Sequence, residues 1–554
     1  MGFVSDDSVY CSEANEGESW ANALRHTVEM TTGGRFLPAH FLFITSLYVS
    51  NELVFRFVSI IGVVIASIFF AVSVKSMSGL RAHLVLKIAS ACLVFIQLRT
   101  YHDPVLSFGL LIPAVIALNA SAVVFLWAFL KTGSRRYGVA LVAAWSTALL
   151  TYELSFGFLP FLLWLTHPSS RERRWLTPAF LCIAAPAAAV ALGAIVARLL
   201  GEGNYEGTVA NLDLARAVRT GFFQIAGSIP LMTNELRRLE LDGLLGLTVV
   251  ASGFTVAFLF PLERCVVSAR TWVFLGLSWV LPGLAIAFSA KYQGELGRGV
   301  AYLPVLLSTF ALGSSAWLVW SMFDVWGRRV IAAVLVVLLA CVWRVNINVS
   351  NFVAAQFTEP RRTLTSFLAA LPRDALRPAD IVSFRGNHDL DSVQPGWGWY
   401  SWESPHFLER LGHHVQATLA SGWFRVRDGP SVLAVGQEES VLGTKAIMIW
   451  YGSTSGGRGF LLMPVETQAG TLAAQAGRLW CGSWRPSDNS IGSGSATVEF
   501  LPTPARIFSL PDTGAVGCFE STGASLDELV LVAGQQRLHF MITNVGLVPI
   551  SAPN

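Results

Sequence analysis

Long apolar segments recur through the first two-thirds of the chain, and short polar segments separate them. A helix needs about 20 apolar residues to cross a hydrocarbon layer of ~30 Å, so segments near that length predict transmembrane helices. They occupy residues 53–74, 84–98, 109–130, 176–199, 244–262, 271–289, 303–323 and 330–349.

One further apolar segment, 138–165, is too long for one upright helix and too short for two full ones. Glu153 lies in its middle, and an ionisable group there is costly to expose to lipid. We therefore expect a tight helical hairpin or a broken pair of helices. With this pair, the expected number of crossings is ten.

Basic residues gather in alternate loops between the apolar segments, and the positive-inside rule assigns such loops to the cytoplasm. The residues are Lys75, Arg81, Lys131, Arg135, Arg136, Arg171, Arg173, Arg174, Arg264, Arg270, Arg328 and Arg329. The opposite, outer side is then expected to hold residues 1–52, 99–104, the turn near Glu153, 201–243, 291–302 and everything after 349.

Residues 350–554 differ in composition, being rich in Gly, Ser and Pro without any segment of membrane length. Residues 358–371 predict an amphipathic helix that begins at Thr358, with Pro360 in its first turn. Short runs of β-branched and aromatic residues predict strands. These runs are 380–384, 431–435, 445–450, 459–464, 496–501, 529–532 and 538–543.

The pattern therefore predicts a polytopic α-helical membrane protein with a C-terminal extracytoplasmic α/β, strand-rich soluble domain. Three regions are expected: an outer acidic loop and interfacial segment at 1–52, a transmembrane helical domain at 53–349, and the soluble domain at 350–554. Cys481 and Cys518 both lie in the last region. An oxidising compartment would favour a disulfide between them, and two free thiols are the alternative.

The amino-acid composition supports a membrane protein and argues against some classes of partner and metal site. Only 14% of the 554 residues are charged, whereas soluble domains are nearer a quarter. The net charge of +3 and the lack of a basic block argue against nucleic acid as a partner. The seven cysteines show no metal-ligand spacing, so we assign no metal ligands, although a requirement for a divalent metal stays open.

Two acidic clusters fall on the expected outer side, and their carboxylates are the candidate catalytic groups. Asp6 and Asp7 precede the first apolar segment, whereas His102 and Asp103 follow the second. A carboxylate held at the membrane surface could accept the proton of an acceptor hydroxyl. The alternatives are a solvated terminus for the first pair and a helix-capping role for Asp103.

Other outer residues are candidates for substrate binding. Cations there could bind a lipid-linked phosphate through charge-assisted hydrogen bonds, or they could contact lipid headgroups instead. An intramembrane carboxylate such as Glu153 could face a cavity, or it could be a turn residue. The candidates are Arg35, Arg99, His102, Glu153, Lys291, Tyr292, Gln293 and Arg298.

These features together resemble a known superfamily. An outer acidic segment leads into Gly33-Gly34-Arg35-Phe36-Leu37-Pro38, and His102-Asp103-Pro104 follows a short helix. With many crossings and an outer C-terminal domain, the sequence resembles the GT-C integral-membrane glycosyltransferases, which use polyprenyl-phosphate-linked sugars. The resemblance implies a catalytic base at Asp6 or Asp7 and a second acidic motif at His102-Asp103.

The resemblance also implies partners and a location. The donor would be a lipid-linked sugar in the inner (plasma) membrane, and the acceptor an extracytoplasmic glycan, lipid or protein of the cell envelope. The first helix of the superfamily is not present before Asp6, so we expect one upstream of Met1. Two other classes stay open: a transporter or flippase of lipid-linked saccharides, and a membrane scaffold that binds glycans.

Overall fold

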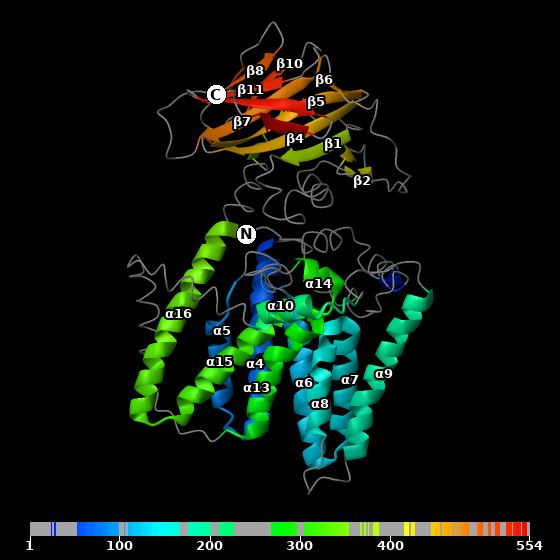
Figure 1. Ribbon diagram of the computed structural model, residues 1–554, viewed down its shortest axis with the longest axis vertical. Helices are drawn as coiled ribbons and strands as arrows, with labels where there is room; N and C mark the ends of the chain where they lie inside the picture. Colours follow the sequence, from blue (N-terminus) through cyan, green and yellow to red (C-terminus); the bar gives the residue numbers. More distant parts are fainter. Residues whose placement is uncertain are drawn as a thin grey trace. The chain divides into compact units, whose positions relative to one another are not determined.

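Figure 1 shows the computed structural model of the chain. In the N-terminal and helical parts it describes residues 24, 27–28, 31, 52–98, 105, 109–166, 176–200, 210–225, 267–295 and 304–353. Beyond these it describes 366–367, 370–372, 375, 381–386, 415–419, 423–426, 445–454, 457–468, 471–474, 477–486, 496–501, 508–510, 516–520, 528–533, 536–543 and 546–550.

The described residues form two compact units, and the second begins after Val353. The first unit is helical. Its elements are α4 (Glu52–Ser78), α5 (Leu84–Val94), α6 (Leu111–Thr132), α7 (Arg135–Thr151), the 3-10 helix η1 (Glu153–Phe158), α8 (Leu159–Leu165), α9 (Leu176–Leu200), α10 (Leu214–Ile225), α13 (Ala269–Ala287), α14 (Ala290–Glu295), α15 (Pro304–Met322) and α16 (Val325–Val353).

Five of the helices within the described ranges are long and apolar enough to cross a membrane. They are the spans Val54–Ser78, Leu111–Thr132, Thr177–Leu199, Val305–Met322 and Val325–Asn351. This confirms that the chain has the helices of a membrane protein. The ten crossings remain a prediction, and the predicted segment 244–262 lies outside the described residues.

Two shorter apolar helices refine the predicted pattern. The segment predicted at 84–98 is helical only over Leu84–Val94, which is about 16 Å at 1.5 Å per residue. This helix is too short to span hydrocarbon alone. The segment 138–165 is a broken pair, as its length and Glu153 indicated, because α7 ends at Thr151 and η1 and α8 follow. Tyr152 separates them in an extended conformation.

An aromatic cluster fills the centre of the helical unit. Phe70 of α4 lies 5.3 Å from Phe274 of α13 and 5.9 Å from Phe310 of α15, measured between ring centroids. Phe161 of α8 lies 5.0 Å from Phe274. All four rings are buried, so they join helices that are distant in sequence.

Several helix ends meet at one end of this unit, which we call the Trp127 end. The Lys131 ammonium and the Arg270 guanidinium lie 4.9 and 5.3 Å from the centroid of Trp127. The Ser268 hydroxyl lies 3.1 Å from the Met77 carbonyl oxygen, which joins the start of α13 to the end of α4. Cations with tryptophan are typical of a membrane–water interface.

The second unit consists of strands in two sheets. The first sheet has the order β10-β7-β5-β4-β1-β3-β2, with β6 paired to β5, and the second has the order β13-β12-β11-β8-β9. The strands are β1 (Ile381–Gly386), β2 (Val415–Leu419), β3 (Trp423–Val426), β4 (Lys445–Thr454), β5 (Gly457–Gln468), β6 (Thr471–Ala474), β7 (Leu479–Pro486), β8 (Ala496–Leu501), β9 (Phe508–Leu510), β10 (Gly517–Glu520), β11 (Glu528–Ala533), β12 (Gln536–Thr543) and β13 (Gly546–Ile550).

Pairing in these sheets is antiparallel except between β1 and β4. The long β4–β5 hairpin pairs Lys445 with Glu466 at its open end and Thr454 with Gly457 at its turn. The predicted strand segments overlap β1, β4, β5, β8, β11 and β12, whereas 431–435 lies outside the described residues. Within 358–371, the Ala370 amide donates to the Ser366 carbonyl at 3.1 Å, as a helical turn does.

Candidate functional site

The loop that would carry Arg99, His102 and Asp103 is anchored where it leaves α5. Asn346 of α16 donates from Nδ2 to the Ile96 carbonyl at 2.9 Å and accepts from the Leu98 amide at Oδ1, at 2.8 Å. One side-chain amide thus replaces the partners that a continued helix would supply. This pairing satisfies two backbone groups directly after the end of α5 at Val94.

The same loop is anchored where it enters α6. A Cβ atom on Gly109 would lie 2.7 Å from both Cβ and Oγ of Ser59 on α4. Only a glycine at position 109 lets its backbone approach α4 this closely. The loop therefore begins and ends at fixed points on α16 and α4, and we call this end of the helical unit the Asn346 end.

Helix lengths give the distance of these fixed points from the Trp127 end. Measured along the helices from the Trp127 end, Ser59 lies about 28 Å from Ser78, and Asn346 about 31 Å from Val325. Both values are close to the ~30 Å thickness of a hydrocarbon core. Each helix continues for about 10 Å beyond that level. The two fixed points thus lie along α4 and α16 about 30 Å from the Trp127 end, and both helices continue past them.

Most predicted site residues lie outside the described residues. Glu153, Lys291, Tyr292 and Gln293 are described, and their places can be stated. The others, of which no position is given, are Asp6, Asp7, Arg35, Arg99, His102, Asp103 and Arg298.

Glu153 begins η1 and is half-buried at the turn of the broken pair. Beside it, the Asn119 amide donates to the Ser155 hydroxyl at 3.0 Å, and that hydroxyl donates to the Ala148 carbonyl at 2.9 Å. Asn119 and Ser155 are fully buried. These bonds satisfy the backbone where the helix breaks. Along α7, the turn lies about 24 Å from Arg135, so it is near the same level as the anchored loop.

The η1 segment packs against a second irregular helix, α13. Pro282 lies inside α13 and lacks the N–H that would bond to the Ser278 carbonyl. The Ser278 hydroxyl is buried, and in the described structure it has no hydrogen-bond partner. Gly157 faces the Leu281 carbonyl, 3.6 Å from where its Cβ would lie. The Ser278 hydroxyl is thus a buried polar group about 13 Å along α13 from Ala269, at the middle of the helix.

The Lys291–Gln293 segment lies in α14, directly after α13. Gln293 Nε2 donates to the carbonyls of Asn211 at 3.0 Å and Ala287 at 2.9 Å, so this amide ties the chain before α10 to the end of α13. Tyr292 is buried and Lys291 is half-buried. The hydrogen bonds of Gln293 are therefore structural.

Sequence reasoning did not identify Gln97, Asn119 or Asn346. Gln97 is only 3% exposed, and neither of its amide atoms has a hydrogen-bond partner among the described residues. A buried unpaired amide is costly, typically by about 1–3 kcal/mol, so its presence beside the anchored loop is notable. An amide inside an otherwise apolar segment is the signal that could have found all three residues.

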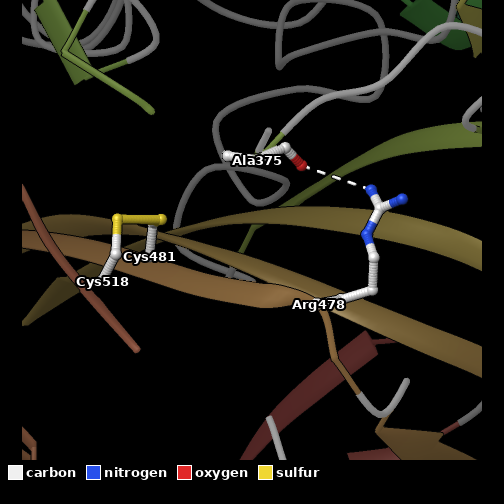
Figure 2. The surroundings of a disulfide bond; sticks show 4 residues. All are labelled: Ala375, Arg478, Cys481 and Cys518. Carbon is white, nitrogen blue, oxygen red and sulfur yellow. Dashed lines mark hydrogen bonds between the residues drawn. A yellow bond between two sulfur atoms is a disulfide. The ribbon is translucent and has the colours of Figure 1, made fainter. Parts of the chain in front are cut away.

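The disulfide left open by the sequence is present in the strand unit. Figure 2 shows Cys481 of β7 joined to Cys518 of β10, and the two residues are direct partners in the sheet with Cα atoms 4.1 Å apart. Nearby, Arg478 donates to the Ala375 carbonyl at 3.3 Å. Among the described cysteines, Cys92, Cys182 and Cys341 of the helical unit do not form disulfides.

Within the described ranges, no group of three or more His, Cys, Asp or Glu side chains could hold a metal ion. Comparisons with protein-family models, curated proteins and solved structures find no match to this chain.

Proposed function

We propose that the protein is a membrane glycosyltransferase that moves a sugar from a polyprenyl-phosphate carrier to an acceptor of the cell envelope. The observation that carries the proposal is the loop between Leu98 and Gly109. Asn346 holds one of its ends and the close approach of Gly109 to Ser59 holds the other, and its sequence contains Arg99, His102 and Asp103. Each of these points lies about one hydrocarbon thickness along its helix from the Trp127 end, a distance that fits a lipid-linked phosphate at the membrane surface.

The proposed chemistry is a single inverting displacement. A carboxylate, Asp103 or one of Asp6 and Asp7, accepts the proton of the acceptor hydroxyl as its oxygen attacks the anomeric carbon. The bond from that carbon to the phosphate oxygen breaks, and the lipid phosphate leaves as an anion. Arg99, Lys291 and Arg298 are the cations proposed to stabilise the leaving phosphate.

We infer that the Asn346 end and the strand unit face away from the cytoplasm. Two features support this orientation. Lys131, Arg135 and Arg270 lie at or beside the opposite, Trp127 end, as the positive-inside rule favours for a cytoplasmic surface. The Cys481–Cys518 disulfide is typical of an oxidising compartment.

Substitution of the carboxylates tests the reaction. Purified protein in vesicles would be given a panel of polyprenyl-phosphate-linked hexoses and pentoses and an envelope-glycan acceptor, and labelled product would be counted. General-base catalysis contributes about 100-fold or more, so Asp103→Asn should reduce transfer at least that far, and Asp7→Asn is measured beside it. Asp213→Asn, at an exposed helix cap, is the matched control and should retain full transfer. Unchanged transfer in both carboxylate variants would exclude these residues as the base.

A flippase of lipid-linked saccharides is the second candidate. Gly157, which follows the break at Tyr152, packs against Leu281 and Pro282 of α13, and the buried hydroxyl of Ser278 lies about halfway along that helix. Irregular helices around a polar group at the midplane are common in transporters. Movement of a fluorescent lipid-linked sugar between leaflets, without any transferred product, would favour this function over the transferase.

A further inference from the structure

Helix α10 has three different faces. At 100° per residue, Ala217, Thr220, Gly221 and Gln224 share one sector of about 100°, and all four are buried. This sector packs on α13: a Cβ on Gly221 would lie 3.4 Å from side-chain atoms of Ala287 and Leu284. The helix is thus fixed to the protein by one side only.

The adjacent sector of α10 is apolar and exposed. Leu214, Val218 and Phe222 follow one another at four-residue intervals and are 68%, 70% and 59% exposed. Leu212, just before the helix, is 78% exposed. An apolar row of this kind, continuous with the buried sector, is not expected to face water.

The remaining sector is cationic. It holds Arg216 and Arg219, both exposed. Asp213 caps the helix by accepting from the amides of Ala215 and Arg216, each at 3.1 Å, and its carboxylate lies 3.3 Å from Arg216 Nε. Arg219 lies over the ring of Phe223, at 5.4 Å from the centroid. The helix therefore has a protein-facing, an apolar and a cationic side in rotational order.

The attachment of α10 fixes its depth. The Asn211 amide donates to the Phe288 carbonyl at 2.8 Å, and Gln293 bonds to the carbonyls of Asn211 and Ala287. Ala287 is the last residue of α13, about 27 Å along that helix from Ala269. That length is close to the ~30 Å thickness of a hydrocarbon core, which fits a position of α10 at the level of the headgroups.

We propose that α10 lies in the membrane interface and binds the lipid bilayer directly, with Leu214, Val218 and Phe222 among the acyl chains and Arg219 on lipid phosphate groups. The order of its faces fits this occupant because the apolar sector and the cationic sector are adjacent, as in interfacial amphipathic helices. The arrangement anchors the end of α13 in a defined lipid layer. It requires a membrane protein and does not depend on the proposed transferase activity.

Depth-dependent quenching tests the proposal. The full chain carrying Val218→Cys would be labelled with an environment-sensitive fluorophore and reconstituted in vesicles of phosphatidylcholine and phosphatidylglycerol. The matched variant is Arg216→Cys, on the cationic face, and the unsubstituted chain treated with the label supplies the background of its own thiols. The label at 218 should be quenched several-fold more strongly by nitroxide on the acyl chains than by aqueous iodide, and the label at 216 should show the reverse order.

Equal quenching of both labels by iodide would overturn the proposal, because α10 would then lie in water. Strong acyl-chain quenching at both positions would also overturn it, since the cationic face would then be buried in lipid. In a second measurement, Arg219→Gln should reduce the difference in labelled-helix depth between vesicles with and without phosphatidylglycerol. An unchanged difference would exclude Arg219 as the phosphate contact.

Discussion

The two ends of the helical unit are held together in different ways. At the Trp127 end, cations and a tryptophan ring gather where helices turn, with Lys131 and Arg270 on the same indole. At the Asn346 end, helices stop at unequal heights, and the side-chain amides of Asn346 and Gln293 bind backbone groups of distant segments. The first end uses interactions that any membrane surface favours. The second depends on single residues, among them the ones that hold both ends of the loop on which the proposed function rests.

The largest effect on the Asn346 end is expected when the Asn346 side chain, which holds the start of the loop, is replaced. Asn346→Leu deletes two hydrogen bonds and leaves the Ile96 carbonyl and the Leu98 amide without this partner. Because both hydrogen bonds are part-buried and each contributes about 0.5–1.5 kcal/mol, we expect a loss of about 1–3 kcal/mol in the free energy of unfolding, together with loss of transfer. Thermal unfolding in detergent and the transfer assay would measure the two effects.

The matched control for this prediction is Asn348→Leu, on the same helix. Asn348 is exposed, so its replacement should leave both stability and transfer nearly unchanged. Equal losses in the two variants would mean that the Asn346 amide has no special role at this end.

A second prediction concerns how α5 is held against α15. In Gly313→Ala, the new Cβ would lie 2.5 Å from the Ala91 carbonyl oxygen and 3.0 Å from Cys92 Cα. Backbone atoms cannot turn aside, so the helices must separate, at a cost of about 1–3 kcal/mol. A lower melting temperature in detergent would report this change.

Gly276→Ala provides the comparison within α13, because nothing lies within 4 Å of the position of its Cβ. Alanine there should be neutral or stabilising by up to ~1 kcal/mol, since glycine is the poorer helix former. If the two alanine variants melt at the same temperature, close packing of α5 on α15 is not important for stability.

The smallest effect is expected at the Trp127 end. Trp127→Leu removes two cation–ring contacts, each worth about 0.5–1 kcal/mol, while retaining an apolar side chain. Trp326→Leu, where one cation lies over a ring that is 73% exposed, should cost less. A loss at Trp127 greater than that of Asn346→Leu would reverse the contrast between the two ends.

The helical pattern was largely predictable from the sequence. The break within 138–165 followed from its length and from Glu153, because a charged residue in an apolar segment needs a turn or a partner. The short length of α5 was not predictable from its apolar run. After its last turn, the Ile96 carbonyl accepts a hydrogen bond from Asn346, 250 positions further along the sequence. The periodicity of apolar residues carries no information about a hydrogen bond between residues so far apart in the sequence.

The candidate site was predictable only in part. The three carboxylates predicted to be catalytic and most of the predicted cations lie outside the described residues. Gln293 drew attention as a polar residue between two helices, yet its amide hydrogen bonds serve structure. Gln97 and Asn119 are single buried amides in apolar segments. The mean hydropathy of such a segment changes little with one amide, so it does not reveal these residues.

The Cys481–Cys518 bond has a consequence for how the strand unit can be divided. Strands β8 and β9 of the second sheet lie between the two cysteines, whereas β7 and β10, which the bond joins, belong to the first sheet. The chain from Cys481 to Cys518 and the disulfide thus form a covalent ring that contains β8 and β9 of the second sheet and is closed between two strands of the first sheet. Such a ring restricts the unfolded chain by on the order of 4 kcal/mol for a separation of 37 residues. The two sheets are thus parts of one covalent assembly, and no single cut between the cysteines can release either as an independent module.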